Sequence, residues 1–320
     1  MQLRVILFLF FVLGVLSPPD EILGVPDSNQ AKLTEQSLVA ELEAIKKAFT
    51  LGKVDSASSL LSEFNLNHQK HIQSSLELKA AYFSTEATAE YERGHYNSAL
   101  SKYKSAHKVY QSLSGNKNRP ELLELRNDIG RVLIDLNRFE DAKSNYSETL
   151  KALKLYKPSE IDSVELSILY NQMGVVEFYE GNLDKAFEFY DNSRTISVMH
   201  EGRNNVNAAR AYYNMGLIKE EKGYLIDAGI FYNKALQIYQ ERLGEAHHHI
   251  AEVYGSLGSV HLKRYELVKA QYYFQKDLET SMQIYGEGHI ETAWGYEDLA
   301  KVYKIERKKN LAKKFFKKAL

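Results

Sequence analysis

Residues 170–190 read YNQMGVVEFYEGNLDKAFEFY, and residues 212–232 read YYNMGLIKEEKGYLIDAGIFY. Both stretches place a small residue, a glycine, an alanine and an aromatic residue at the same offsets. Apolar residues recur every three or four positions around the central glycine, as Met215 and Ile218 do before Gly223. This periodicity predicts two amphipathic helices, and the glycine between them predicts a tight turn.

The same four columns recur along the chain at a spacing of 42–44 residues. The turn position holds Gly52, Gly94, Asn137, Gly181, Gly223, Tyr265 and Arg307. Five residues later comes an alanine (Ala57, Ala99, Ala142, Ala186, Ala228, Ala270, Ala312), and nine residues later a large residue (Leu61, Tyr103, Tyr146, Tyr190, Tyr232, Phe274, Phe316). Seven residues before the turn lies a small residue: Ala87, Gly130, Gly174, Gly216, Gly258 or Ala300. Four columns in one register indicate an internal repeat.

The repeat predicts an all-α fold, a right-handed α-solenoid (superhelix) of about seven antiparallel helical hairpins over residues 33–320. We expect turns near residues 52, 94, 137, 181, 223, 265 and 307. Each turn residue should adopt the left-handed backbone conformation, which suits glycine and which asparagine tolerates. Tyr265 and Arg307 should adopt it at a higher energetic cost. The small residue of the first helix should let the second helix approach closely. The large residue nine after the turn should fill the space between repeats.

These residues resemble the tetratricopeptide repeat, whose first helix carries the Tyr-x-x-Met-Gly pattern seen at Tyr170–Gly174 and Tyr212–Gly216. The 42-residue spacing is similar to the variant found in kinesin light chains, as is the segment from Leu243 and Gly244 to His247. The resemblance covers about residues 33–320. It implies an interaction fold in which the motif residues build the scaffold, so it does not by itself identify a ligand.

The N-terminal residues form a separate segment. Residues 1–24 contain one cation, Arg4, followed by an apolar run from Val5 to Leu16, which is typical of a secretory signal. The run is short for a transmembrane helix, and its cleavage site is poor, so an uncleaved membrane anchor remains an alternative. We therefore expect an exported protein that is periplasmic, secreted or membrane-tethered. Residues 25–32 are expected to be a linker.

Composition excludes several classes of site. The chain has no cysteine, which excludes disulfides, thiolate metal sites and cysteine nucleophiles. Its 41 Lys and Arg nearly balance 42 Asp and Glu, so the net charge of −1 gives no general attraction to nucleic acid. No glycine-rich phosphate loop, Gly-x-Ser-x-Gly or His-Glu-x-x-His motif is present. We expect no catalysis and no cofactor.

Two further clusters have ordinary structural interpretations. His247, His248 and His249 are adjacent, and the repeat register places them in an inter-repeat loop, where neighbouring side chains do not converge on one ion. We therefore assign no metal site. The basic tail from Arg307 to Lys318 is interpreted as a solvated end of the array, because lysines near a helix C-terminus are favoured by the helix dipole. A patch for acidic lipid or nucleic acid is the alternative.

The groove lined by the first helices is the expected binding surface. In the resembled family, ligand contacts fall at fixed offsets around the small residue of the first helix, and further positions lie on the groove wall. The candidate peptide-groove residues are Asn127, Arg131, Asn171, Gln172, Tyr179, Arg210, Tyr213, Asn214 and Glu220. Amide side chains can bind a peptide backbone without demanding a particular sequence.

The sequence therefore predicts a non-catalytic scaffold or adaptor that binds a protein or peptide partner. One alternative is a peptide-responsive regulatory sensor. Another is the N-terminal repeat region of a longer enzyme or signalling protein, and a third is a kinesin-light-chain-like cargo adaptor. The sequence does not specify the partner or the oligomeric state.

Overall fold

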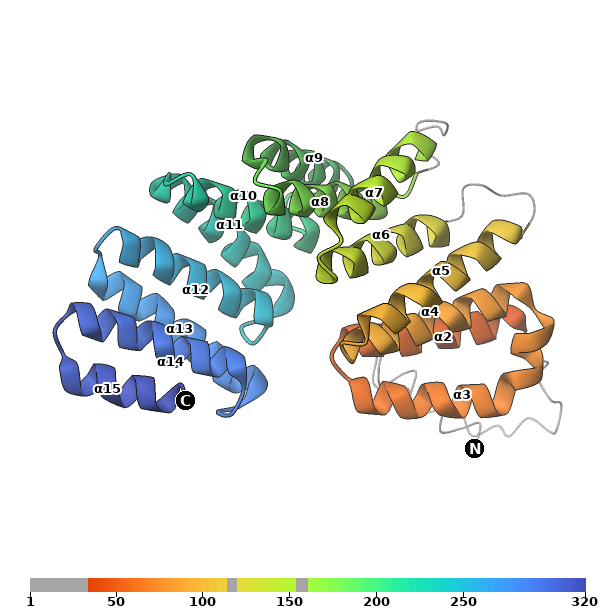
Figure 1. Cartoon of the computed structure of the whole chain (residues 1–320), viewed down its shortest axis with the longest axis horizontal. Coiled ribbons are helices and arrows are strands. Elements are labelled where there is room, and N and C mark those ends of the chain that lie inside the picture. Colours follow the sequence, from red (N-terminus) through yellow and green to blue (C-terminus); the bar gives the residue numbers. More distant parts are fainter. Residues whose placement is uncertain (1–33, 114–119, 154–160) are drawn as a thin grey trace, which may run out of the picture. The chain divides into compact units, whose positions relative to one another are not determined.

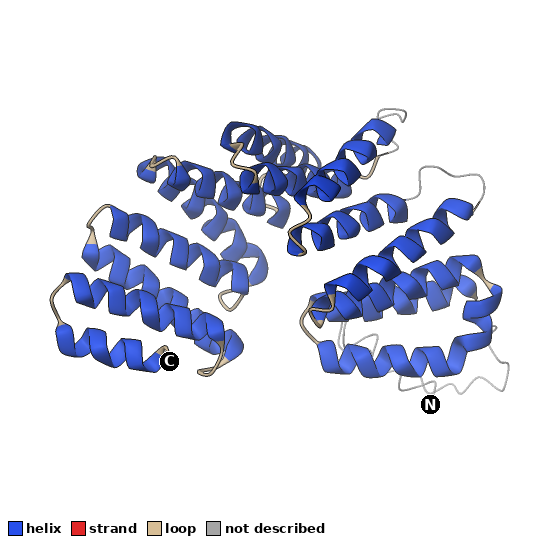
Figure 2. Ribbon diagram, viewed as in Figure 1, coloured by secondary structure: helices blue, strands red, loops and turns tan. Residues whose placement is uncertain are grey.

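The computed structural model describes residues 34–113, 120–153 and 161–320, which form fourteen helices and no strand (Figures 1 and 2). The predicted all-α repeat fold is confirmed. The expected signal or anchor at residues 1–24 and the linker at residues 25–32 lie outside the described residues. The chain divides into two compact units, unit 1 (Met1–Glu160) and unit 2 (Ile161–Leu320).

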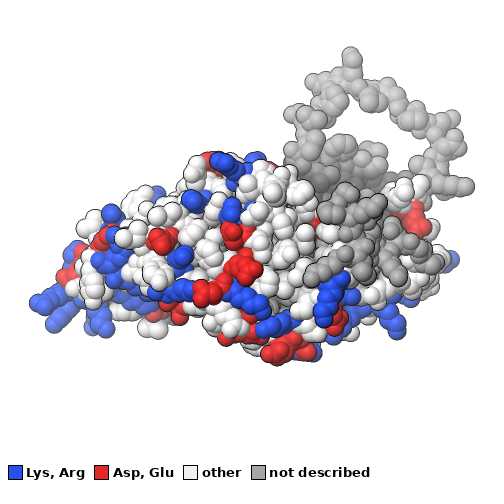
Figure 3. All heavy atoms as spheres, turned by 90° about the horizontal axis from the view of Figure 1, so that it is seen from above, with Lys and Arg blue, Asp and Glu red and all other residues white. Residues whose placement is uncertain are grey.

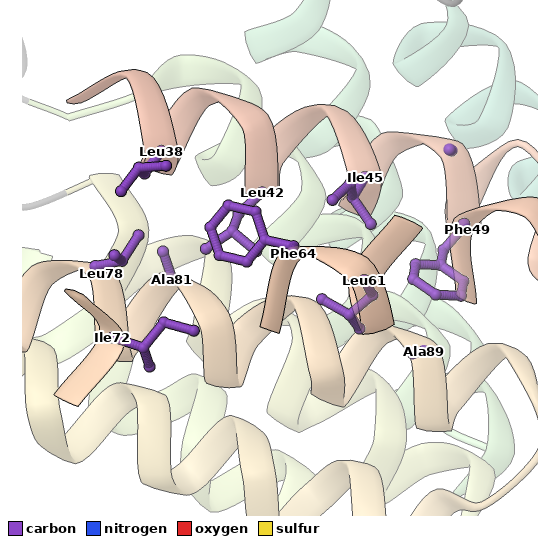
Figure 4. Close-up of a cluster of buried hydrophobic side chains, with 12 residues drawn as sticks. Leu38, Leu42, Ile45, Phe49, Leu61, Phe64, Ile72, Leu78, Ala81 and Ala89 are labelled. Carbon is purple, nitrogen blue, oxygen red and sulfur yellow. The ribbon is translucent and has the colours of Figure 1, made fainter. Parts of the chain in front are cut away.

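Unit 1 contains three helical hairpins, each made of consecutive helices in contact. The pairs are α2 (Glu35–Thr50) with α3 (Val54–Ser74), α4 (Leu76–Glu92) with α5 (Tyr96–Ser112), and α6 (Pro120–Asp135) with α7 (Phe139–Leu153). Figure 4 shows the first core, in which Leu42 of α2 lies beside Phe64 of α3, and Leu38 of α2 lies beside Leu78 of α4. Phe49 and Phe64 are almost fully buried. Burial of each such side chain contributes about 1.5–3 kcal/mol.

Unit 2 contains four hairpins that stack in chain order, each contacting the next. The pairs are α8 (Ser163–Tyr179) with α9 (Leu183–Glu201), α10 (Val206–Glu221) with α11 (Leu225–Leu243), α12 (His248–Lys263) with α13 (Leu267–Tyr285), and α14 (Ile290–Ile305) with α15 (Lys309–Lys318).

The turn residues adopt the backbone conformation expected from the repeat. All seven have positive φ, between 56° and 80°, including the non-glycine residues Asn137, Tyr265 and Arg307. A second series, Gly202, Gly244 and Gly286, also has positive φ and ends the second helices.

Three residues after Gly202, Gly244 and Gly286, a side chain caps the first helix of the following hairpin, which is α10, α12 or α14. Asn205 Oδ1 accepts from the Ala208 N–H, and the Nδ1 atoms of His247 and His289 accept from the N–H two residues on. Each cap thereby supplies a hydrogen-bond acceptor to a backbone N–H group that has no carbonyl partner within its own helix.

The small residue and the large residue of each hairpin are in direct contact. A Cβ atom built on Gly174, Gly216 or Gly258 would lie 2.5–2.6 Å from the ring sixteen residues later in the same hairpin. Tyr190, Tyr232 and Phe274 supply these rings and are at most 2% exposed. Each ring thus packs against the first helix of its own hairpin, in addition to filling the hydrophobic core between repeats. Phe316 on α15 is the exception in this column, with 36% of its surface exposed.

We predict that Gly216→Ala lowers the free energy of unfolding by about 1–3 kcal/mol, because the added methyl group forces the buried Tyr232 ring to move. The ring cannot move freely, since its hydroxyl donates to Glu220. Urea denaturation of the full chain, followed by circular dichroism, measures the change.

Gly229→Ala is the matched control, because Gly229 is also inside a helix of the same hairpin. The nearest atom to its added Cβ is Val260 Cγ1 at 4.0 Å, an ordinary contact. Alanine is favoured over glycine in a helix interior, so this variant should gain about 0.5–1 kcal/mol. Equal effects of the two substitutions would contradict the proposed packing.

Candidate functional site: grooves on the first helices

The first helices of three successive hairpins in unit 2 surround an open hollow of about 310 Å³. We call it the unit 2 groove, and its lining comes from α8, α10 and α12. The lining residues are Phe178, Leu217, Glu220, Glu221, Gly255, Ser256, Ser259 and Lys263. The helical period brings residues three and four apart onto one face, which explains why Ser256, Ser259 and Lys263 point the same way.

Glu220 is the centre of the polar network in the unit 2 groove. Its Oε1 atom accepts hydrogen bonds from Ser259 Oγ and Lys263 Nζ, both at 2.8 Å. Its Oε2 atom accepts from the Tyr232 hydroxyl at 2.7 Å. Burial and the Glu220 carboxylate raise the pKa of Tyr232, so the hydroxyl stays protonated as the donor. Glu220 thereby joins α10 to α11 and α12, and its side chain is only 11% exposed.

The predicted amide positions in unit 2 are buried and bonded to each other. Asn171 and Asn214 are 4% and 9% exposed, and the Asn214 amide donates to Asn171 Oδ1 at 2.9 Å. Beside them, the hydroxyls of Tyr213 and Ser256 are 3.3 Å apart. These side chains connect α8 to α10 and α10 to α12 below the open surface.

The remaining predicted positions of unit 2 lie outside the lining of its groove. Tyr179 is 62% exposed at the end of α8, while Gln172 and Arg210 are partly exposed on α8 and α10. Phe178, Ser256, Ser259 and Lys263 line the groove and were missed. The repeat register could have found two of them, because Phe178 lies 42 residues before the predicted Glu220 and Ser256 lies 42 residues after the predicted Asn214.

Unit 1 carries a second hollow, the unit 1 groove, of about 300 Å³. Residues of α2, α4, α5 and α6 line it, among them Lys46, Ser84 and Glu124. Lys46 Nζ donates to Glu124 at 2.6 Å and to Ser84 Oγ at 3.1 Å, and it lies 3.5 Å from Asp128. Burial would lower the pKa of Lys46, but the carboxylates of Asp128 and Glu124 outweigh it and raise that pKa.

The predicted residues Asn127 and Arg131 belong to α6 of unit 1. Arg131 donates to Asp128 at 3.0 Å and lies over the Tyr91 ring, 4.3 Å from its centroid. Asn127 is only 4% exposed. Asp128 therefore accepts from two cations, Arg131 and Lys46, and this network holds α2, α4 and α6 together. Lys46 was missed although it lies six residues before the turn of its repeat, in the same column as the predicted Arg131.

The three consecutive histidines occupy the start of α12. His247 is the cap, while His248 and His249 lie in the first helical turn together with Glu252. The ligand atoms of His248, His249 and Glu252 all lie within 4.8 Å of one another. Partial desolvation by its neighbours, followed by the imidazoles of His249 and His247, lowers the pKa of the exposed His248 to about 4, and Arg210 of α10 acts in the same direction. Sequence reasoning assigned these histidines to a loop and overlooked Glu252.

Asp277 on α13 is a buried carboxyl group behind the first helices of unit 2. A Cβ on Gly255 of α12 would lie 3.3 Å from its Oδ2 atom. Burial raises the pKa of Asp277 to about 7. The Ser281 hydroxyl, 3.2 Å from Oδ1, opposes the shift, while the nearby carboxylates of Asp298, Glu291 and Glu252 add to it.

The surface charge on one face of the molecule is mixed. Lys and Arg side chains are interspersed with Asp and Glu on the face seen in Figure 3. Across residues 34–113, 120–153 and 161–320, none of the helices has the length and apolar character needed to cross a membrane.

The comparisons with known proteins agree with this architecture. The tetratricopeptide repeat family matches residues 165–241 and 207–276. Among solved structures, the chain is similar to BtubC (BKLC) from P. vanneervenii, with 20% identity, a TM-score of 0.61, and coverage of 69% of this chain and 87% of that one. It is also similar to the apo form of RapI, with 16% identity, a TM-score of 0.63, and coverage of 88% of this chain and 75% of that one. A third similar structure is NprR in complex with its cognate peptide NprX, with 15% identity, a TM-score of 0.63, and coverage of 90% of this chain and 79% of that one. No match is found among curated proteins.

Histidines with a lowered pKa, such as His248, make the fold more stable as pH rises from about 4 to 6.5. We predict that Asp277 acts in the opposite direction and lowers the free energy of unfolding by up to about 4 kcal/mol as pH rises from about 4 to 7. Its pKa of about 7 in the fold exceeds the ordinary 3.8, so the folded state holds a proton that the unfolded state has released. Asp277→Asn removes this contribution, so the stability of the variant relative to the unmodified chain should increase between pH 5 and pH 8. Urea denaturation at pH 5 and pH 8 measures it.

The control for this experiment is Glu188→Gln, which removes an exposed carboxylate from α9 of the same unit. It should keep the pH dependence of the unmodified chain. If Asp277→Asn keeps that dependence as well, Asp277 is not the group responsible.

Proposed function

We propose that the chain is a tetratricopeptide-repeat protein and a non-catalytic scaffold that binds a peptide segment of a partner protein along the unit 2 groove. The observation that carries this proposal is the lining of the groove. Phe178 and Leu217 supply apolar surface, and Ser256, Ser259 and Lys263 supply hydrogen-bonding groups next to it. Apolar contact with a few oriented polar groups is the usual composition of a binding cleft.

The polar groups suit an extended peptide backbone. Serine hydroxyls can both donate and accept, so Ser256 and Ser259 can serve backbone N–H and C=O groups of many sequences. Lys263 is 53% exposed at the rim and pairs with Glu220, so its ammonium group can also reach a carboxylate of the ligand. The NprR structure, which contains the peptide NprX, supports peptide binding by a chain of similar fold.

A structural role for Glu220 supports the non-catalytic part of the proposal. This carboxylate accepts three hydrogen bonds, from Tyr232, Ser259 and Lys263. An ionised carboxylate has about four lone-pair sites, so most of the accepting capacity of Glu220 is used inside the fold. The arrangement of Glu220 fixes the first helices at the spacing that forms the groove.

Export is a separate proposal that rests on the sequence of residues 1–24. The cation at Arg4 and the apolar run that follows support a secretory signal, or an anchor if it is not cleaved. N-terminal sequencing of the protein isolated from its host tests this. A full-length chain that begins at Met1 and fractionates with cytosolic proteins would contradict export.

We predict that peptides selected from a displayed random library on the immobilised full chain lose binding when Ser259 is replaced by Trp. The indole would fill the unit 2 groove between Leu217 and Lys263. Affinity should fall at least tenfold, measured by fluorescence anisotropy of the enriched peptide. Lys263→Ala, which leaves the apolar floor intact, should cause a smaller loss.

Gln237→Trp is the matched control, because Gln237 is exposed on α11, a second helix that does not line the groove. Replacement of Asn171 is a poorer test, since it leaves the buried amide of Asn214 unpaired and destabilises the fold. Equal binding to the Ser259→Trp and Gln237→Trp variants would refute the groove as the peptide site.

A further inference from the structure

We propose that His248, His249 and Glu252 bind a divalent transition-metal ion such as Zn²⁺ at the start of α12. Imidazole nitrogens and a carboxylate oxygen are ligands that suit zinc, and three protein ligands leave a coordination position open. The argument for this site does not depend on the proposed peptide binding.

The repeat explains His247 but not the two histidines that follow it. Asn205, His247 and His289 occupy the same register position, and each caps the first helix of its hairpin. The next two positions hold Val206 and Asn207 in the preceding repeat and Ile290 and Glu291 in the following one. The scaffold therefore does not require histidine at positions 248 and 249, which distinguishes this repeat from its neighbours.

The helix brings the third ligand to the histidines. Glu252 lies three residues after His249 and four after His248, so all three share one side of the first turn. The His249 Nδ1 and Glu252 Oε2 atoms are 3.1 Å apart, and all three ligand atoms lie within 4.8 Å. Two ligand atoms at about 2.0–2.1 Å from a tetrahedral zinc are about 3.3 Å apart. Small side-chain rotations would therefore complete the site.

The His249 ring is held in place by its surroundings. It stacks on Tyr239 of α11, with centroids 4.9 Å apart and an interplanar angle of 22°. Its side chain is 21% exposed, so it is supported on one side and open on the other. A ligand whose ring is already oriented loses less conformational entropy on binding.

The position of the site gives the metal access to the unit 2 groove. His249 and Glu252 continue the same face of α12 that carries Ser256, Ser259 and Lys263, at alternating spacings of three and four residues. The open coordination position of the ion would lie one helical turn from Ser256. A carboxylate or imidazole at one end of a bound ligand could complete the coordination.

Two nearby positive charges work against a cation here. The start of α12 carries the positive end of the helix dipole, and Arg210 of α10 acts electrostatically on His248. The Glu252 carboxylate opposes both. We therefore expect micromolar affinity for Zn²⁺, tighter binding in Arg210→Gln, and no comparable binding of Mg²⁺, which prefers oxygen ligands.

Isothermal titration of the full chain with ZnCl₂, without a histidine tag and in a non-chelating buffer, tests the site. The expected result is one Zn²⁺ per chain, with affinity reduced at least tenfold in His248→Ala and in Glu252→Gln. His248 is exposed, so its removal should leave the thermal melt of the metal-free protein unchanged. Titration with Co²⁺ provides a spectroscopic readout, because tetrahedral coordination gives intense visible absorption.

His200→Ala is the matched control, since it removes an exposed histidine from α9 of the same unit and should leave Zn²⁺ binding intact. Absence of Zn²⁺ binding by the unmodified chain would overturn the proposal. Equal affinities of the unmodified, His248→Ala and Glu252→Gln chains would also overturn it.

Discussion

The contact between a glycine and an aromatic ring sixteen residues later is the constraint on which the hairpins depend. Gly216 has no side chain, so the buried Tyr232 ring can lie where a Cβ atom would stand. The ring then fixes the distance between the two helices, and its hydroxyl fixes Glu220. Glu220 in turn bonds two groups of α12, so the shape of the unit 2 groove follows from a contact beneath it.

The sequence predicts the fold in detail because the repeat imposes it seven times. Tyr265 and Arg307 show this most clearly, since neither residue favours positive φ, yet both adopt it at about 60°. Such a conformation costs about 1–2 kcal/mol for a residue with a side chain. The register predicts the turn at these two positions where local preference alone would not.

The grooves were less predictable because they depend on distances between helices. Asn171 and Asn214 were expected to face a ligand, but α8 and α10 are close enough for the two amides to bond to each other. A single sequence shows that both residues lie on first helices, not how far apart those helices are. Glu252 was overlooked for a related reason: the helix begins at His248, which converts a run of adjacent histidines into one face of a turn.

In the hairpins with Gly130, Gly174, Gly216 or Gly258, the glycine and the ring belong to the same repeat, so each of these repeats carries its own packing contact. Groove positions that do not bond to the ring can be substituted without disturbing this contact, whereas Glu220 accepts a hydrogen bond from Tyr232 and is coupled to it. After duplication, individual copies could diverge without collective compensation. Glu220, His248 and His249 each occur at their repeat position in one copy only, although the bonds of Asp128 and Glu220 also reach other hairpins. The array can therefore acquire a new binding specificity one repeat at a time.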